Sequence, residues 1–197
     1  MGRKCWLAHD RMTDMTEEIS QPRGYDIQTA TPNDIDGILE VERQSWVTTY
    51  PNEEEGIAKF DIENRFRDLP GRTRAIQEDM AAGNHRYTIV KVESKIIGYS
   101  HVMREQHSND VVEMYVLPDY QNQHIGRRLL EEALRWLGSE KPVQLEVVTY
   151  NTRAMAFYRK FGFVEERMRH QSESEEWNTL PSGKRMPVVF MVRQPDE

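Results

Sequence analysis

The stretch "PDYQNQHIGRRLL", Pro118 to Leu130, stands between a run of strand-forming residues and a helix whose apolar face recurs at helical spacing from Leu129 to Leu137. The joint holds a turn, "QNQHIG", followed at once by Arg127 and Arg128. Cations in a first helical turn oppose the helix dipole, whereas the free N–H groups there attract an anion. Two interpretations stay open: an ordinary helix start with two solvated arginines, or a joint that binds an anion.

The segments before this joint predict an antiparallel sheet. "RYTIVKVES" (86–94), "KIIGYSHVMRE" (95–105) and "DVVEMYVLP" (110–118) are strand-like and are separated by short turns, which is typical of a meander. Earlier, "YDIQTA" (25–30) alternates like a short strand. A helix over 31–46 then opens with Thr31, Pro32 and Asp34 in a capping-box-like arrangement.

Two further stretches complete the first half of the chain. "EEEGIAKFDIENRFRDL" (53–69) predicts a second helix, with Glu53–Glu55 as its solvated first turn and with Pro70 and Gly71 ending it. A polar or helical stretch follows before the meander begins.

After the joint the pattern changes to alternating helices and strands. The first helix spans 126–137 and is ended by Gly138, and "VQLEVVT" (143–149) is the next strand. Asn151 caps a helix that runs to Phe161, with Gly162 as its stop. "FVEERMRH" (163–170) and "MPVVFMVRQ" (186–194) predict a final strand pair, joined by a long polar loop.

A meander followed by βαβα predicts the α+β class, with one mixed sheet of about seven strands and helices on both of its faces. At 197 residues the chain is expected to hold one domain, over 25–195, after a flexible extension over 1–24 of unstated role. Ligands in such sheets lie where strand order changes, at strand carboxyl ends. That location coincides with Pro118–Leu130.

Composition narrows the classes of partner. Hydrophobic residues make up 38% and charged residues 30%, as in soluble globular proteins, and the longest apolar run, Val188–Val192, is too short to span a membrane. The net charge of -7 disfavours nucleic acid and favours cationic ligands such as amines. The lone Cys5, the absence of zinc-type spacing and the absence of a signal peptide predict a cytoplasmic protein without a metal.

The joint and a later segment together resemble a known family. Val116–Leu130 is similar to the acyl-CoA motif of the GNAT N-acetyltransferase superfamily, whose pattern is Gln/Arg-x-x-Gly-x-Gly/Ala, and "NTRAMAFYRKFGF" (151–163) resembles its second signature. The resemblance covers about Tyr25 to Arg193. It departs at His124, where the family usually has its first glycine. His is among the residues enriched at positive φ, so we expect the turn to survive, although the side chain could clash with CoA or add a donor to its phosphates.

The resemblance implies acetyl-CoA as co-substrate. In that family the strand before the motif runs beside the pantetheine arm, the motif turn holds the pyrophosphate, and the fourth and fifth strands splay, often at a bulge. The cofactor-binding residues implied here are Met114, Tyr115, Val116, Gln121, Asn122, Gln123, His124, Ile125, Gly126, Arg127, Asn151 and Tyr158. A role as N-cap would by itself explain why asparagine is at position 151. Packing in the core would likewise explain Met114 and Val116 without any contact to CoA.

Acetyl transfer to an amine needs an acid for the departing thiolate and a base for the amine. The resemblance assigns the acid to Tyr158, which from spacing alone is a core tyrosine. Glu113 is the predicted base, with Asp110, His101 or water as alternatives, and a solvated edge carboxylate as the plain interpretation of Glu113. The predicted walls of the acceptor pocket are Trp46, Thr49, Tyr50 and Trp177.

The function implied is an acyltransferase that passes an acetyl group from acetyl-CoA directly to a primary amine of a small molecule or peptide. An alternative is a GNAT-like domain that binds CoA as a sensor and has lost turnover through His124. A third interpretation keeps the fold as an interaction module with no affinity for CoA. The sequence leaves the acceptor, the base and a possible homodimer open.

Overall fold

Residues 24–166 and 177–195 of the computed structural model are described. Their strands form one mixed sheet in the order β1-β2-β3-β4-β5-β7-β6. The strands are β1 Asp26–Thr29, β2 His85–Val92, β3 Lys95–Arg104, β4 Asn109–Val116, β5 Val143–Val148, β6 Val164–Glu166 and β7 Val188–Arg193. All neighbours are antiparallel except β4 and β5, so the predicted meander and mixed seven-stranded sheet are confirmed.

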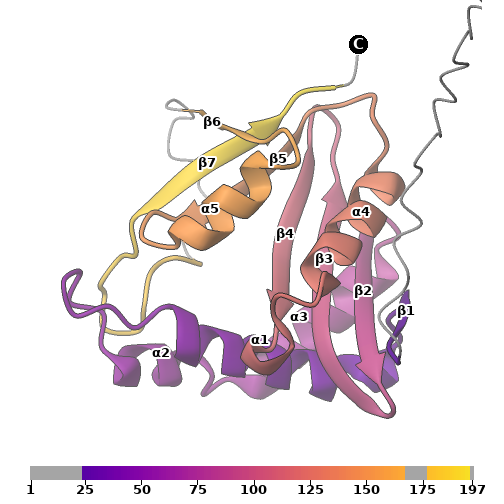
Figure 1. Ribbon diagram of the computed structural model, residues 1–197. Coiled ribbons are helices and arrows are strands. Elements are labelled where there is room, and N and C mark those ends of the chain that lie inside the picture. The colour runs from indigo at the N-terminus through magenta and orange to yellow at the C-terminus, as the bar shows by residue number, and fades with distance from the viewer. Residues whose placement is uncertain (1–23, 167–176, 196–197) are drawn as a thin grey trace, which may run out of the picture.

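Helices cover the two faces of the sheet (Figure 1). Their bounds are η1 Pro32–Asp34, α1 Ile35–Thr49, α2 Lys59–Arg65, α3 Leu69–Ala81, η2 Pro118–Tyr120, α4 Ile125–Leu137 and α5 Thr152–Arg159. In Figure 1, α4 and α5 lie in front of the sheet and α3 behind it. None of the described helices is long and apolar enough to cross a membrane.

The apolar stripe of α4 explains its position. Leu129, Leu130 and Ala133 are almost fully buried, and they join two neighbouring core clusters. The first cluster lies between α1, α4 and the strands β2 and β3, whereas the second surrounds α5, β5 and β7. Because α4 contributes to both, it fixes the joint at Pro118–Leu130 relative to both halves of the sheet.

The start of the first helix follows the capping residues. The backbone N–H of Thr31 donates to Asp34 Oδ2 at 2.8 Å, and the Thr31 hydroxyl donates to the same oxygen. Asp34 Oδ1 accepts from Lys91 Nζ at 2.6 Å, which ties this helix start to β2. Burial, the largest influence, would raise the pKa of Asp34, but these partners together lower it.

The predicted second helix was wrong in its bounds. Glu53–Glu55 lie in a turn closed by bonds between Asn52 and Ile57, with Gly56 at φ 65°, and the helix begins only at Lys59. Pro70 and Gly71 do not end a helix but lie in the first turn of α3. Asp68 caps α3 by accepting from the Gly71 N–H. Proline is tolerated in a first turn, because its missing N–H would have no partner there.

The sheet divides between β4 and β5. Only Asn109–Val143 and Asp110–Gln144 pair across them, and no further ladder pair joins the two strands among the described residues. On the β3 side, the register shifts so that Val102 faces Val111 while His101 faces Glu113, which leaves Val112 as a bulge. A bulge bends its strand, and here β4 diverges from β5 beyond it (Figure 1).

Some expectations fall outside the described residues. These are residues 1–23 of the predicted extension, with Cys5, and residues 167–176 of the predicted strand and loop near the end of the chain.

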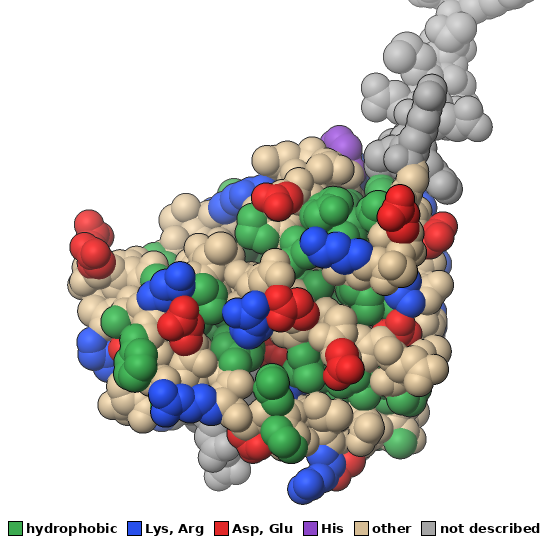
Figure 2. Space-filling view, turned by 90° about the horizontal axis from the view of Figure 1, so that it is seen from below, with side chains coloured by type: hydrophobic (Ala, Val, Ile, Leu, Met, Phe, Trp, Pro, Cys, Tyr) green, Lys and Arg blue, Asp and Glu red, His purple; other side chains and the backbone are tan. Residues whose placement is uncertain are grey.

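The face over α1 and α2 is seen in Figure 2, where basic and acidic side chains are interspersed without a basic patch.

Candidate active site

The divergence of β4 and β5 opens into a cleft of about 1260 Å³, which we call the splay cleft. One wall is β4 and the other is β5, while the N-terminal turns of α4 and α5 close one end and α1 the other. This is the position at which the sequence predicted a ligand.

The turn before α4 has a left-handed conformation at two residues. Asn122 lies at φ 63° and His124 at φ 61°, and His124 is the residue immediately before the helix. The expected survival of the turn with His in place of glycine is therefore confirmed as a backbone conformation. Gln121 stabilises the turn, because its side-chain amide donates to the Val116 carbonyl at 3.0 Å.

A cation that the sequence did not reveal lies at this turn. The guanidinium of Arg153, in the first turn of α5, donates to Gln121 Oε1 at 2.6 Å and to Asn122 Oδ1 at 2.9 Å. Arg153 and Arg127 both line the splay cleft. Arg127 is partly neutralised by Glu131, which accepts from its Nε at 2.8 Å, so Arg153 is the stronger candidate for pairing with an anion.

Eleven of the twelve predicted cofactor residues line the splay cleft. The exception is Gln123, whose exposed side chain donates to the Asp119 carbonyl. Gly126 lies where an added Cβ would come 3.9 Å from the Phe157 ring and 4.0 Å from Val116, so the backbone there is close to both walls. Asn151 is the N-cap of α5, since its side chain accepts from the Ala154 N–H at 3.1 Å.

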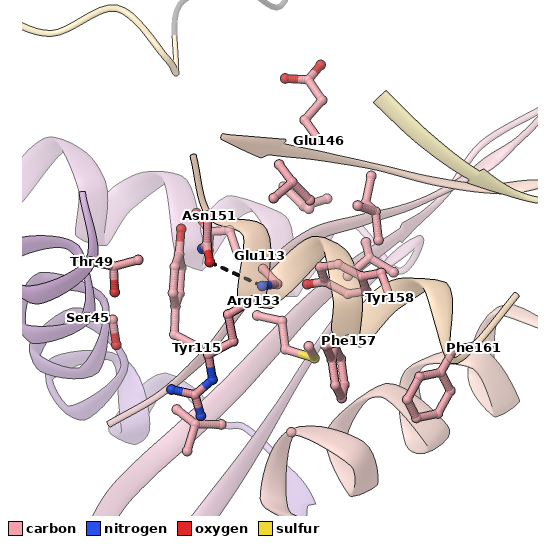
Figure 3. A pocket seen from close by; sticks show the side chains of 18 of the residues that line it. Ser45, Thr49, Glu113, Tyr115, Glu146, Asn151, Arg153, Phe157, Tyr158 and Phe161 are labelled. Atoms are coloured by element: carbon pink, nitrogen blue, oxygen red, sulfur yellow. Dashed lines mark hydrogen bonds between the residues drawn. The ribbon is translucent and has the colours of Figure 1, made fainter. Parts of the chain in front are cut away.

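Tyr158 lies on α5 between two phenylalanine rings. Its ring packs edge-on against Phe157 and Phe163, and its side chain is 8% exposed. Figure 3 shows its hydroxyl pointing into the splay cleft. Burial raises the pKa of Tyr158, so the phenol keeps its proton at neutral pH.

Glu113 lines the splay cleft but is held by two partners. Arg72 Nη2 on α3 donates to one carboxylate oxygen, and the Tyr99 hydroxyl donates to the other at 3.0 Å. The same guanidinium binds Glu42 on α1, through Nε at 3.1 Å. Burial, followed by the charge of Glu113, raises the pKa of Glu42. Arg72 thus joins α1, α3 and β4 through two carboxylates that are 41 and 30 residues away from it.

The alternative bases lie in different surroundings. Asp110 lines the splay cleft near the point where β4 and β5 still pair. His101 is on β3 and is 4% exposed, and burial lowers its pKa to about 3, so its ring is neutral. Glu146 on β5, which the sequence reasoning missed, also lines the cleft and accepts from the Trp177 indole N–H.

The predicted acceptor walls come together at the α1 end of the splay cleft. Trp46 packs edge-on against Tyr50 at 4.6 Å and Trp177 at 6.2 Å between ring centroids, and its indole N–H donates to the Tyr115 hydroxyl at 2.9 Å. Arg65 stacks 4.3 Å from the Trp46 ring. Thr49 and Ser45 line the same end (Figure 3). The result is an aromatic pocket with one cation on its rim.

Comparison with known proteins identifies relatives in sequence and in fold. Residues 83–165 match a family model described as an acetyltransferase (GNAT) domain. The chain is similar to N-alpha-acetyltransferase RimI of Mycobacterium tuberculosis, with 32% identity over 110 residues that cover 54% of this chain and 69% of that protein.

Two further similar proteins match a larger share of this chain. An uncharacterized protein of Mycobacterium leprae is 30% identical over 141 residues, which are 70% of this chain but 34% of that protein, so the chain spans about a third of its length. The crystal structure of PaiA N-acetyltransferase from Thermoplasma acidophilum in complex with coenzyme A superposes with a TM-score of 0.66 at 20% identity. The match covers 87% of this chain and 99% of that one.

Proposed function

The chain belongs to the GNAT acetyltransferase family, and from this premise we propose that it transfers an acetyl group from acetyl-CoA directly to a primary amine of a small molecule or peptide. The observation that carries the proposal is the splay cleft. It connects an anion-binding helix start with a buried tyrosine and an aromatic pocket. The similarity to RimI puts peptide N-termini among the first acceptors to test.

The residues along the splay cleft fit CoA. Beyond Asp110 the β5-facing edge of β4 has no ladder partner among the described residues, so its backbone groups can pair with the pantetheine amides. The turn before α4 offers helix N–H groups, and Arg153 and Arg127 add charge for phosphates. Bound acetyl-CoA would supply the acetyl group as a thioester.

The chain's own residues then handle the protons. Tyr158, which stays protonated because it is buried, donates its proton to the departing sulfur. Backbone N–H groups of the free β4 edge stabilise the negative charge that develops on the carbonyl oxygen. The aromatic pocket at the α1 end orients the acceptor and excludes water.

Glu113 removes the proton of the amine in this proposal, through a water. Each of its oxygens accepts one hydrogen bond, from Arg72 or Tyr99. A carboxylate offers about four acceptor positions, so positions remain for a bridging water. Glu146 on the opposite wall is the alternative carboxylate, because it lines the same cleft.

A Tyr158→Phe variant tests the proposal. Loss of the phenol proton should lower kcat by about 10²- to 10⁴-fold, the range for a general acid, while the affinity for CoA changes little. Acetyl transfer to a panel of peptide, lysine and polyamine amines measures the rate, and calorimetry measures CoA binding. Tyr25→Phe is the matched control, because that tyrosine packs against the core cluster of α1, away from the cleft.

The outcome separates the alternatives. A wild-type protein that binds CoA but acetylates none of these amines would favour the sensor function. Equal rates for wild type and Tyr158→Phe would exclude Tyr158 as the acid. No affinity for CoA in either protein would leave only the interaction module.

A further inference from the structure

Asp79, His85 and His101 form a cluster outside the splay cleft that the proposed reaction does not use. They come from the last turns of α3, the first residue of β2 and the middle of β3. One ligand-type atom from each lies within 4.8 Å of those of the other two. Their separations of 6 and 16 residues along the chain match no zinc motif, which explains why the sequence predicted no metal.

The distances suit a small divalent cation. His85 Nδ1 and His101 Nε2 are hydrogen-bonded at 2.9 Å, while Asp79 Oδ1 lies 3.7 Å from His85 Nδ1 and Asp79 Oδ2 lies 3.9 Å from His101 Nε2. Ligands at the usual zinc bond lengths are about 3.3 Å apart in a tetrahedral site. Small side-chain shifts would therefore bring the three atoms onto one ion.

The ring of His101 directs Nε2 toward His85 and Asp79, and an ion bound there would replace the hydrogen bond between the two histidines. The ring stacks on Tyr87 with centroids 4.0 Å apart and an interplanar angle of 12°, which fixes its orientation. Its other nitrogen, Nδ1, is buried without a hydrogen-bond partner and lies 3.9 Å from Glu113 Oε2. Metal-bound histidines commonly direct the second ring nitrogen toward a carboxylate, and Glu113 is in position for that role.

The charges of the surroundings favour a cation. Asp79 is close to Glu113 through His101, and Glu113 shares Arg72 with Glu42. The network holds three carboxylates, of Asp79, Glu113 and Glu42, and one guanidinium, of Arg72, so acidic groups outnumber basic side chains in it. A divalent ion would add positive charge where acidic groups are in excess. Asp79 and His85 are partly exposed, with side-chain values of 27% and 15%, so an ion and a completing water can reach the site.

We propose that Asp79, His85 and His101 bind a transition-metal ion of the zinc class, with water as the fourth ligand. Two imidazole nitrogens and one carboxylate suit Zn²⁺ better than Mg²⁺ or Ca²⁺, which prefer oxygen ligands. The ion joins α3 to β2 and β3, and it reaches the splay cleft through His101 and Glu113. Its role is to stabilise this corner of the fold and orient Glu113.

The test uses the full chain, expressed without a histidine tag and stripped of metal by a chelator. Zn²⁺ titration by calorimetry should give one ion per chain with a dissociation constant on the order of micromolar or tighter. Co²⁺ in place of Zn²⁺ should give the intense visible absorption of a four-coordinate site. Mg²⁺ at the same concentration should leave the melting temperature unchanged.

His85→Gln and Asp79→Asn carry the test, because the buried His101 could be needed for folding. Each should weaken Zn²⁺ binding at least about tenfold and abolish the Co²⁺ absorption. His107→Gln, which removes an exposed histidine outside the cluster, should bind like the wild type. Failure of the wild type to bind one Zn²⁺ overturns the proposal. Equal affinity in wild type and His85→Gln does so too, because binding would then occur elsewhere in the chain. None of these readouts depends on acetyl transfer.

Discussion

His124 shows how a residue other than glycine can take the left-handed conformation immediately before a helix. A side chain in the left-handed region costs about 1–2 kcal/mol, and histidine, asparagine and glycine tolerate it better than β-branched residues do. The φ of 61° therefore explains why a histidine is acceptable at this position.

A His124→Val variant should unfold with a free energy about 1–2 kcal/mol lower than that of the wild type, and it should bind CoA more weakly. Urea denaturation measures the first effect and calorimetry the second. His124→Asn is the control that keeps the left-handed conformation. If His124→Gly instead bound CoA much more tightly than the wild type, the histidine side chain would be an obstruction.

Individual residues were predicted where a local motif exists. Gln121, Gly126 and Asn151 occupy positions fixed by their own turn or helix, and all three line the splay cleft, while their contact with CoA stays a prediction. Arg153 and Glu146 were missed because nothing near them in the sequence marks their role. The partners of Arg153 are 31 and 32 residues away and meet it only once α4 and α5 have packed.

At the scale of elements, the start of α1 makes stability depend on pH. The folded pKa of Asp34 is lowered relative to the unfolded value, so its stabilisation is present above that unfolded value and is lost as pH falls through the folded pKa. The free energy of unfolding of the Asp34→Asn variant should be about 1–3 kcal/mol lower than that of the wild type at neutral pH. The difference from the wild type should shrink toward zero at an acid pH below the lowered folded pKa of Asp34.

Urea unfolding curves at both pH values measure this dependence. Asp36→Asn is the matched control, because Asp36 is exposed in the first turn of the same helix. A difference between Asp34→Asn and wild type that stayed constant with pH would argue against the Lys91 pair as its cause.

The packing of α1, α3 and β4 depends on the side chain of Arg72, whose guanidinium contacts all three elements. Arg72→Met would leave two carboxylates, on Glu42 and Glu113, without their cation in a largely buried position. Breaking such a pair costs about 3–5 kcal/mol. Chemical denaturation should show this loss, and adding Glu42→Gln should recover part of it. Arg74→Met, on an exposed position of α3, should change little.

Elements with strong periodicity were predicted well, whereas the bounds of α2 and α3 were not. The run Glu53–Glu55 suits a helical first turn by composition, but Gly56 at positive φ lets the chain fold back onto Asn52. Pro70 and Gly71 look like terminators, yet Asp68 caps the next helix around them. A terminator and an initiator use the same residue types, so local sequence alone did not distinguish them.

For the molecule as a whole, acetyl-CoA in the splay cleft should act as a stabiliser. At 100 times its dissociation constant a ligand adds about 2.7 kcal/mol to the free energy of unfolding, which raises the melting temperature by several degrees. ATP, which lacks the pantetheine arm, should raise it much less. A thermal-shift titration compares the two. Equal shifts would mean that the phosphates alone determine binding and that the free β4 edge is not used.

The same free edge bears on self-association. A strand with unpaired backbone groups on the outside of a protein invites strands from other molecules and leads to aggregation. Here the unpaired stretch of β4 lies inside a cleft, between the N-terminal turns of α4 and α5 at one end and α1 at the other. A slender extended molecule can enter that space, whereas the broad edge of another sheet is kept out by the helices. We therefore expect this edge of β4 to pair with a ligand in the cleft and not with strands of other molecules.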